Sequence, residues 1–164
     1  MSSSSPSSPA SPAVDFAALA EAAYPESGVG DRAALDALWR ATLDLPEWFF
    51  LVHPDRVKRG EDPFPFIAEV GDTGWIFAFT SENGAGAFAH EHELLGPNDQ
   101  VYCVRIVTRD ARILIQRMAQ YSVSQVHFDE GEGWSVPVGE LEDIAERLGR
   151  GLGNAVRPER GVPE

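Results

Sequence analysis

Apolar side chains recur along this chain at two spacings, and each spacing predicts a type of element. Positions three and four apart share one face of a helix, whereas alternate positions share one face of a strand. The helical spacing predicts helices over 15–24, 32–45, 81–92, 109–121 and 138–148. The alternating or continuous apolar runs predict strands over 47–53, 66–70, 75–80, 101–107, 123–128 and 134–138.

Polar residues at the element ends sharpen these predictions. Asp31 is placed to cap the second helix, Thr80 or Ser81 the third and Thr108 the fourth. Pro54 ends the first strand, and the polar segment 54–65 is predicted to be a loop. The faces expected toward the core are Leu35, Leu38, Trp39 and Thr42 or Leu43; Trp48, Phe50 and Val52; Ala85, Phe88 and Ala89; Ile113, Ile115 or Gln116, and Ala119; and Leu141, Ile144, Ala145 and Leu148.

The order of elements indicates one α+β domain over residues 14–150, with helices packed on a mixed β-sheet. "GDTG" and "DEGEG" each join two apolar runs, which predicts two β-hairpins. Ser and Pro dominate residues 1–13, which lack apolar side chains to bury and are expected to be disordered. Residues 151–164 are expected to form a flexible C-terminal tail.

The net charge of the chain restricts the expected partners more than its composition does. The chain has 164 residues, 43% of them hydrophobic, and a net charge of -13 from 26 acidic and 13 basic side chains. A strongly acidic surface repels nucleic-acid phosphates and anionic membranes, so neither is an expected partner. The single cysteine, Cys103, forms no internal disulfide, and the N-terminus does not resemble a secretory signal. A cytoplasmic protein that does not span a membrane is therefore expected.

The stretch "TSENGAGAFA" (80–89) has the G-x-G-x-x-A spacing of a dinucleotide-binding turn. Four residues separate Phe79 from the first glycine, however, and a cap at Thr80 or Ser81 would start the helix before the glycines. Gly84 and Gly86 would then lie inside a helix and weaken it. Replacing Gly84 by Ala is expected to stabilise the protein, whereas an added methyl group at Gly86 is expected to approach the sheet.

His90 and His92, in "HEH", are the residues that most resemble metal ligands. On a helix two residues at i and i+2 point about 200° apart, so both cannot bind one ion without help. His53, His127 or acidic residues would have to complete such a site. The alternative is a polar helix end, where histidine interacts favourably with the helix dipole.

Arg105 lies on the same face of its predicted strand as Val101, Cys103 and Val107. An arginine on an apolar face requires a carboxylate or phosphate partner, so Arg105 is a candidate anion contact. A structural ion pair or a position at the solvent edge of the sheet is the favoured interpretation. Cys103 is expected to behave as a small apolar residue rather than as a nucleophile.

The chain contains no G-x-S-x-G, H-E-x-x-H, Walker lysine or C-x-x-C motif. "FDEGEGW" lacks the alternating ligands of an EF-hand loop and is interpreted as a hairpin turn. No catalytic residue and no cofactor are therefore assigned.

Several phrases together resemble the N-terminal domain of the bacterial SseB (enhanced serine sensitivity) family. They are "ALWRATLDLPEWFFLV", the hairpin after it, and "GWIFAFTSENGAGAFA", in which Thr80, Ser81 and Phe88 match the family's strand-to-helix step. The resemblance covers residues 31–148, although the Asn-Pro that closes the family pattern is missing. It implies a regulatory role through protein partners and transfers no site residues.

These observations favour a non-enzymatic, cytoplasmic binding or regulatory module that acts through a protein partner. The sequence leaves a homodimer open. The alternative is a small enzyme or metal-binding protein that uses His53, His90, His92 or His127 with acidic residues.

Overall fold

A computed structural model describes residues 13–28, 30–131 and 133–153. The predicted Ser/Pro tail, residues 1–13, lies outside the described residues except for its last position. The predicted C-terminal tail, 151–164, lies outside them except for its first three positions. The remaining chain forms one α+β domain, as the sequence predicts.

The strands form two sheets that meet at one bridge. In the smaller sheet β1 (Glu47–Leu51) pairs antiparallel with β4 (Cys103–Val107). The larger sheet has the order β2-β3-β5-β6, and its strands are β2 (Ile67–Val70), β3 (Thr73–Ala78), β5 (Val123–Phe128) and β6 (Trp134–Pro137). The β3–β5 pair is parallel and its neighbours are antiparallel, so the sheet is mixed and both predicted hairpins are confirmed. A bridge between Phe49 and Phe79 connects the two sheets.

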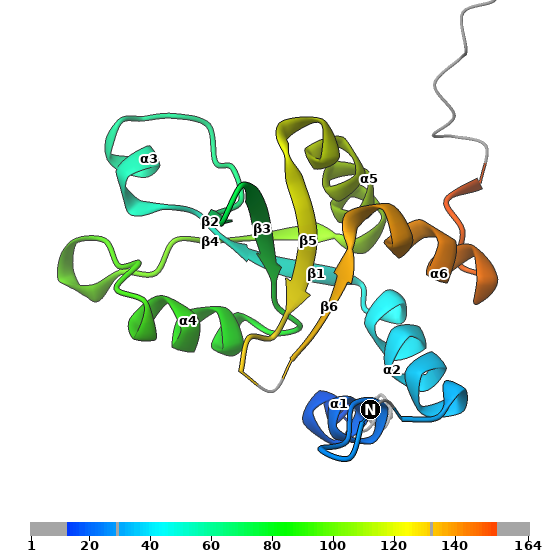
Figure 1. The fold of residues 1–164 in the computed structure, drawn as a ribbon. Helices are drawn as coiled ribbons and strands as arrows, with labels where there is room; N and C mark the ends of the chain where they lie inside the picture. Colours follow the sequence, from blue (N-terminus) through cyan, green and yellow to red (C-terminus); the bar gives the residue numbers. More distant parts are fainter. Residues whose placement is uncertain (1–12, 29, 132, 154–164) are drawn as a thin grey trace, which may run out of the picture.

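The helices surround the larger sheet (Figure 1). They are α1 (Phe16–Ala23), α2 (Arg32–Asp44), α3 (Pro54–Lys58), α4 (Glu82–Glu91), α5 (Thr108–Met118) and α6 (Leu141–Arg147), with short 3-10 turns at Pro97–Asp99, Ala119–Tyr121 and Val138–Glu140. In Figure 1, α4 lies on one side of the sheet, and α2, α5 and α6 lie on the other. None of the helices in the described ranges combines the length and apolarity that crossing a bilayer requires.

Aromatic rings fill the main core between the larger sheet and helices α1, α2, α5 and α6. Phe128 on β5 lies edge-on to Trp48 at 4.8 Å between ring centroids, and it stacks on Trp134 at 5.6 Å. All three side chains are almost completely buried. Rings this close contribute favourable contacts in addition to the apolar area they bury, so Trp48, Phe128 and Trp134 hold β1, β5 and β6 together.

A second cluster packs α4 against the bridge region. Phe77 and Phe79 of the β3 segment contact Phe88 of α4, with ring centroids 5.0 Å and 5.3 Å away. Ala85 and Ala89 are fully buried beside Phe88, which confirms the predicted i, i+3, i+4 face. This cluster holds α4 against the sheet, and both ends of α4 bear on the candidate site.

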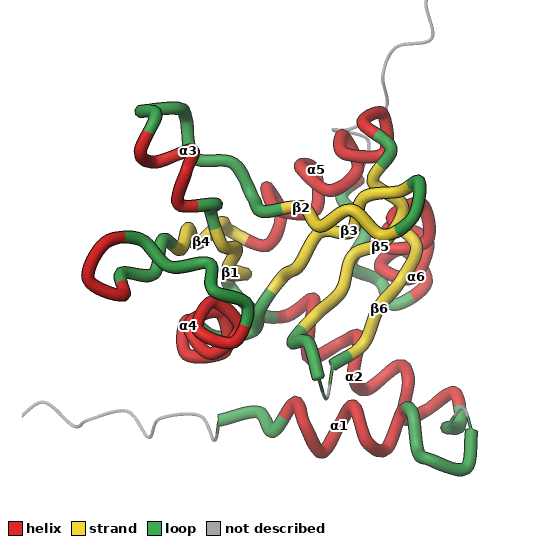
Figure 2. Tube along the Cα trace, turned by 60° about the vertical axis from the view of Figure 1, so that its left-hand side comes forward, coloured by secondary structure: helices red, strands yellow, loops and turns green. Residues whose placement is uncertain are grey.

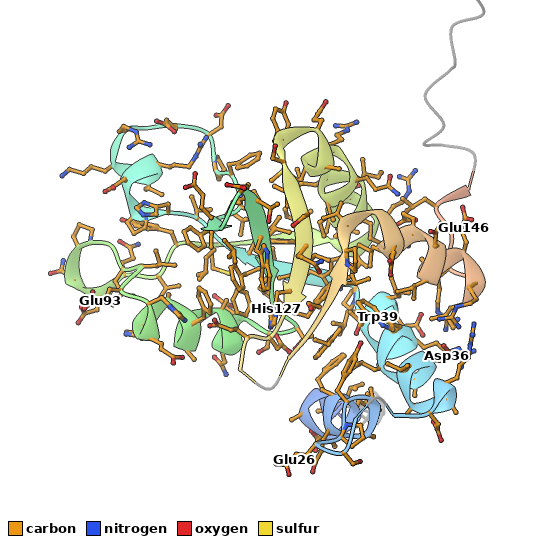
Figure 3. All side chains as sticks on the ribbon, viewed as in Figure 1. Glu26, Asp36, Trp39, Glu93, His127 and Glu146 are labelled. Atoms are coloured by element: carbon orange, nitrogen blue, oxygen red, sulfur yellow. The ribbon has the colours of Figure 1, made fainter. Side chains whose placement is uncertain are left out.

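Ion pairs join α6 to α2 at the opposite side of the domain. Figure 3 shows Asp36 of α2 and Glu146 of α6 on the same side of the molecule. The Arg147 guanidinium donates to Asp36 at 2.6 Å, and this hydrogen bond holds the pKa of the Asp36 carboxyl below its usual value. Arg150 donates two hydrogen bonds to Asp44, each at 2.7 Å. Both pairs are exposed, so their contribution to stability is small.

Several sequence predictions are wrong. The segment 54–65 is not entirely loop, because Pro54 at the first helical position and the His53 ring, which accepts from the Asp55 N–H, start the short helix α3. Thr108 does not cap α5, because it is the first helical residue and its hydroxyl donates to the Leu45 carbonyl.

The buried face of α5 is also rotated from the predicted one. Ala111, Ile115 and Met118 are fully buried, whereas the predicted Ala119 is exposed and Ile113 is half-buried. Arg112 is buried as well, and its charge is matched by Glu142 of α6. Of the predicted face, Ile115 is buried as expected, and Arg112 was not among the residues expected toward the core.

Candidate functional site

The start of α4 shows whether "TSENGAGAFA" (80–89) forms a dinucleotide-binding turn or a capped helix. Ser81 is the N-cap, α4 begins at Glu82, and the Ser81 hydroxyl accepts from the Gly84 N–H at 3.1 Å. Both glycines therefore lie inside the helix, as predicted. The Asp129 carboxylate accepts from the Thr80 N–H at 2.9 Å and from the Thr80 hydroxyl at 2.6 Å. The Thr80 and Gly84 N–H groups therefore donate to the protein's own side chains, which removes two donors that a pyrophosphate would need.

Asp129 ties the beginning of α4 to the end of β5. It adopts a left-handed backbone conformation, with φ of +45°, which Asp tolerates better than most residues. Burial raises the pKa of its carboxyl, and the Thr80 hydrogen bonds oppose that rise. Gly133 closes the same turn, because an added β-carbon would collide with the carbonyl oxygens of Phe128 and Asp129. The turn between β5 and β6 is thus fixed at both ends.

Three neighbouring hollows surround this turn, and we call them the acidic hollows. The first, about 200 Å³, lies between α4 and the turn. The second, about 330 Å³, lies beside Trp134 and shares Asp129 and Glu130 with the first. The third, about 970 Å³, follows α1 and shares Ala17 and Gly131 with the second. Each hollow therefore shares lining residues with the next, so the three hollows are adjacent along the surface.

Every charged side chain among the described residues that line the acidic hollows is a carboxylate. These residues are Asp15, Glu21, Glu26, Glu91, Asp129 and Glu130. Phe79 and Phe88 add apolar walls to the first hollow, and Trp134 adds one to the second. A surface with apolar walls and carboxylates is complementary to a partner that carries cationic groups.

Trp134 lines the second hollow, and its indole N–H is buried without an acceptor among the described residues. An unpaired buried donor costs free energy, so such groups are rare and frequently accompany a functional surface. The ring itself is held between Phe128 and Phe16, whose centroid lies 5.7 Å away.

The histidines of "HEH" occupy different environments. His90 is exposed on the last turn of α4, and His92 is the C-cap, where its Nε2 lies 2.7 Å from Glu130 Oε2. The structure does not bring His90 and His92 together. Instead it places Glu91, His92 and Glu130 close enough for one ligand atom of each to lie within 4.8 Å of the others.

His53 and His127, the other residues of the metal alternative, lie elsewhere. The His53 ring caps α3. His127 lies on β5 near the middle of the sheet in Figure 3, half-buried and stacked on Trp75 at 6.2 Å. Burial lowers the pKa of its imidazole, so the neutral form is favoured at pH 7.

Arg105 and Cys103 both lie on β4. The Arg105 side chain is 71% exposed and lies 3.8 Å from Glu47 across the two-stranded sheet. This arrangement is the structural ion pair that the sequence favoured over an anion contact. Burial raises the pKa of the Cys103 thiol to about 11, so the reactive thiolate is scarce at pH 7.

Sequence reasoning did not anticipate the contacts that build this surface. Thr80 and Asp129 are 49 positions apart, and His92 and Glu130 are 38 apart. The parallel pairing of β3 with β5 brings these segments together, and no local spacing encodes that pairing. The acidic "DEGEG" was the one available signal, and it was interpreted as a turn, which it is.

Comparison of the chain with models of known protein families gives no match. Comparison with curated proteins likewise gives no match. The resemblance of residues 31–148 to the SseB family therefore stays a prediction.

Proposed function

We propose that this protein is a non-enzymatic binding module that accepts a basic segment of a protein partner in the acidic hollows. The observation that carries the proposal is the uniform charge of the described lining. Six carboxylates from α1, its flanks, α4 and the β5–β6 turn face these hollows without a lining Lys or Arg. The resemblance to SseB supports the same proposal, because that family is associated with regulation and protein partners. We extend the proposal to membership of that family and to a cytoplasmic location.

The hollows lie open along the surface and do not enclose a ligand, which favours a polypeptide over a small molecule. Pockets for small ligands usually enclose about 300–1,000 Å³ and bury most of the ligand. The first hollow, about 200 Å³, is smaller than that range and suits a single long side chain. The third hollow is larger but follows the exposed face of α1, as a groove for an extended segment does.

The proposed partner contributes Arg or Lys side chains whose stems contact Phe88 and whose charged groups reach Glu91 and Glu130. Long basic side chains can bury their apolar stems while their charged ends stay at the surface. Opposite charges also accelerate association, and added salt weakens that effect because it screens exposed charges. Binding through the acidic hollows should therefore weaken steeply as ionic strength rises.

The test is a fluorescence anisotropy titration with a short fluorescein-labelled peptide in which Arg alternates with Ser and Leu, in EDTA. We expect saturable binding that weakens about three- to tenfold in Glu91→Gln/Glu130→Gln, since an exposed ion pair contributes up to about 1 kcal/mol. The control is Glu69→Gln/Asp72→Asn, which removes the same charge at the opposite end of β3.

Equal weakening in the two double variants would show that net charge alone attracts the peptide, and the proposal would then be wrong. A peptide in which Glu replaces Arg should not bind. Saturable binding of that acidic peptide would also contradict the proposal.

The metal-binding alternative keeps one specific observation in its favour, the approach of His92 to Glu130 beside Glu91. It concerns a different ligand and is developed below.

A further inference from the structure

We propose that Glu91, His92 and Glu130 bind one divalent metal ion, of the class to which Zn²⁺ and Ni²⁺ belong. One ligand atom from each residue lies within 4.8 Å of the other two. The proposal does not rest on the peptide-binding function, because a metal site could exist whether or not the acidic hollows bind a partner.

The fold positions the three side chains from two separate segments. Glu91 is the last residue of α4, and His92 follows as its C-cap, with its N–H donating to the Phe88 carbonyl. Glu130 lies in the β5–β6 turn, directly after Asp129, which is anchored to Thr80. The start of α4 and the turn are thus joined by hydrogen bonds, and Glu130 is held near the end of the same helix.

The His92 ring is oriented before any ion arrives. It packs on the Phe88 ring at 4.2 Å between centroids, and its Nε2 points to Glu130 at 2.7 Å. Phe88 is buried in the cluster between α4 and the sheet. A ligand whose ring is already fixed loses less conformational entropy on binding than a freely rotating one.

The distances fit a transition metal after small side-chain rotations. Zn²⁺ binds imidazole nitrogen and carboxylate oxygen at about 2.0–2.2 Å, so tetrahedral ligand atoms are about 3.4 Å apart. The ligand atoms of Glu91, His92 and Glu130 lie up to 4.8 Å apart, so the most distant pair has to approach by about 1.4 Å. Glu91 and Glu130 are exposed enough to move, and water would complete the coordination sphere.

The donor set selects the class of ion. Imidazole suits Zn²⁺ and related transition metals, whereas Ca²⁺ and Mg²⁺ prefer oxygen ligands throughout. Two carboxylates balance the charge of a divalent ion. Within the described part of the chain, His92 is the only basic side chain that pairs with Glu130, and none pairs with Glu91. An arriving cation therefore has no lysine or arginine to displace.

The experiment is isothermal titration calorimetry of the full chain without a His-tag, with ZnCl₂, MnCl₂ and CaCl₂ as separate titrants. We expect one Zn²⁺ per chain and weaker or no binding of Mn²⁺ and Ca²⁺, which prefer oxygen ligands. His92→Gln and Glu130→Gln should each weaken Zn²⁺ binding by about tenfold or more, at least the loss seen when residues supporting a metal site are removed. His90→Gln, two positions away on the same helix end, should leave it unchanged.

Circular dichroism of each variant confirms that it is folded before titration, and its far-ultraviolet spectrum should match that of the original chain. Zn²⁺ binding that persists in His92→Gln, or that falls equally in His90→Gln, would overturn the site. Absence of a one-to-one Zn²⁺ isotherm in the original chain would also overturn it.

The two proposals fail separately. Peptide binding is measured in EDTA, and His92→Gln leaves every lining carboxylate in place. Failure of the metal site therefore shows as lost Zn²⁺ stoichiometry with peptide binding intact. Failure of the binding module shows as lost peptide binding with the Zn²⁺ stoichiometry intact.

Discussion

At the scale of single residues, Arg112 shows how a buried charge is accommodated. Its guanidinium donates two hydrogen bonds to the Glu142 carboxylate, at 2.8 Å and 2.7 Å, and both side chains are largely buried. Desolvating two charges is costly, and the bidentate geometry is what repays that cost. The pair also joins α5 to α6, so it specifies how these helices meet.

Removing one partner of this pair should therefore be severe. Glu142→Ala leaves the Arg112 charge buried and unpaired, and the free energy of unfolding should fall by about 3–5 kcal/mol. The double variant Arg112→Met/Glu142→Leu replaces the pair with apolar side chains of similar size and should recover most of that loss. Urea unfolding of the three proteins checks both, and an equal loss in the single and double variants would show that packing rather than charge sets the cost.

His127 should make the free energy of unfolding depend on pH. Burial lowers the pKa of its imidazole below the ordinary 6.5, so between these two pKa values the unfolded chain binds more protons than the folded one. The free energy of unfolding should then decrease as pH falls from 7 through 6.5 toward the folded-state pKa. His127→Phe keeps a ring against Trp75 and removes the titration, so it should lose less stability over that range. Thermal unfolding of the original chain and of His127→Phe at pH 7 and pH 5 measures the difference. An identical loss of stability in the two proteins would contradict the role of His127.

At the scale of elements, α4 carries the clearest correction to a sequence expectation. Gly86 was expected to be the position where an added methyl group approaches the sheet. In the structure a β-carbon on Gly86 meets nothing within 4 Å, whereas one on Gly84 would lie 3.2 Å from the Ser81 hydroxyl that caps the helix. The helical phase places Ala85, Phe88 and Ala89 on the sheet and turns Gly86 outward.

Gly86→Ala should therefore stabilise the protein by about 0.5–1 kcal/mol, since it removes backbone freedom from the unfolded chain at no steric cost. Gly84→Ala should gain less, because the Ser81 hydroxyl must shift to admit the methyl group. Chemical denaturation of both variants measures the difference. A larger gain for Gly84→Ala would mean that α4 begins in a different register.

The elements themselves were largely predictable, and particular residues show why the rest was not. Asp31 caps α2, Ser81 caps α4, and Trp48 and Phe50 lie on the buried face of β1, because caps and apolar periodicity are local properties. Thr108 was misjudged because its partner, the Leu45 carbonyl, is distant in sequence, and for the same reason no local pattern indicated the pair between Arg112 and Glu142. A local pattern contains no information about such partners.

At the scale of the whole molecule, the candidate site is a product of topology. The parallel β3–β5 pair carries the end of β5 to the start of α4, and α1 then packs along the turn that follows (Figure 2). The acidic character of the surface could be predicted from the sequence. The proximity of the carboxylates of α1, α4 and the turn could not, because it depends on the fold. The sequence indicated His92 as a candidate metal ligand but did not indicate its partner Glu130.

The central claim is that a basic segment binds across the acidic hollows, and ¹⁵N–¹H correlation spectra recorded during titration with the Arg-containing peptide test it most directly. We expect amide shifts that concentrate in residues 15–27, 80–92 and 129–134 and disappear at high salt. Amides of α3 and the β2–β3 turn, at the far end of the larger sheet, should stay in place. Shifts spread evenly over all acidic surfaces, or concentrated on the exposed β4 edge around Arg105, would contradict the claim.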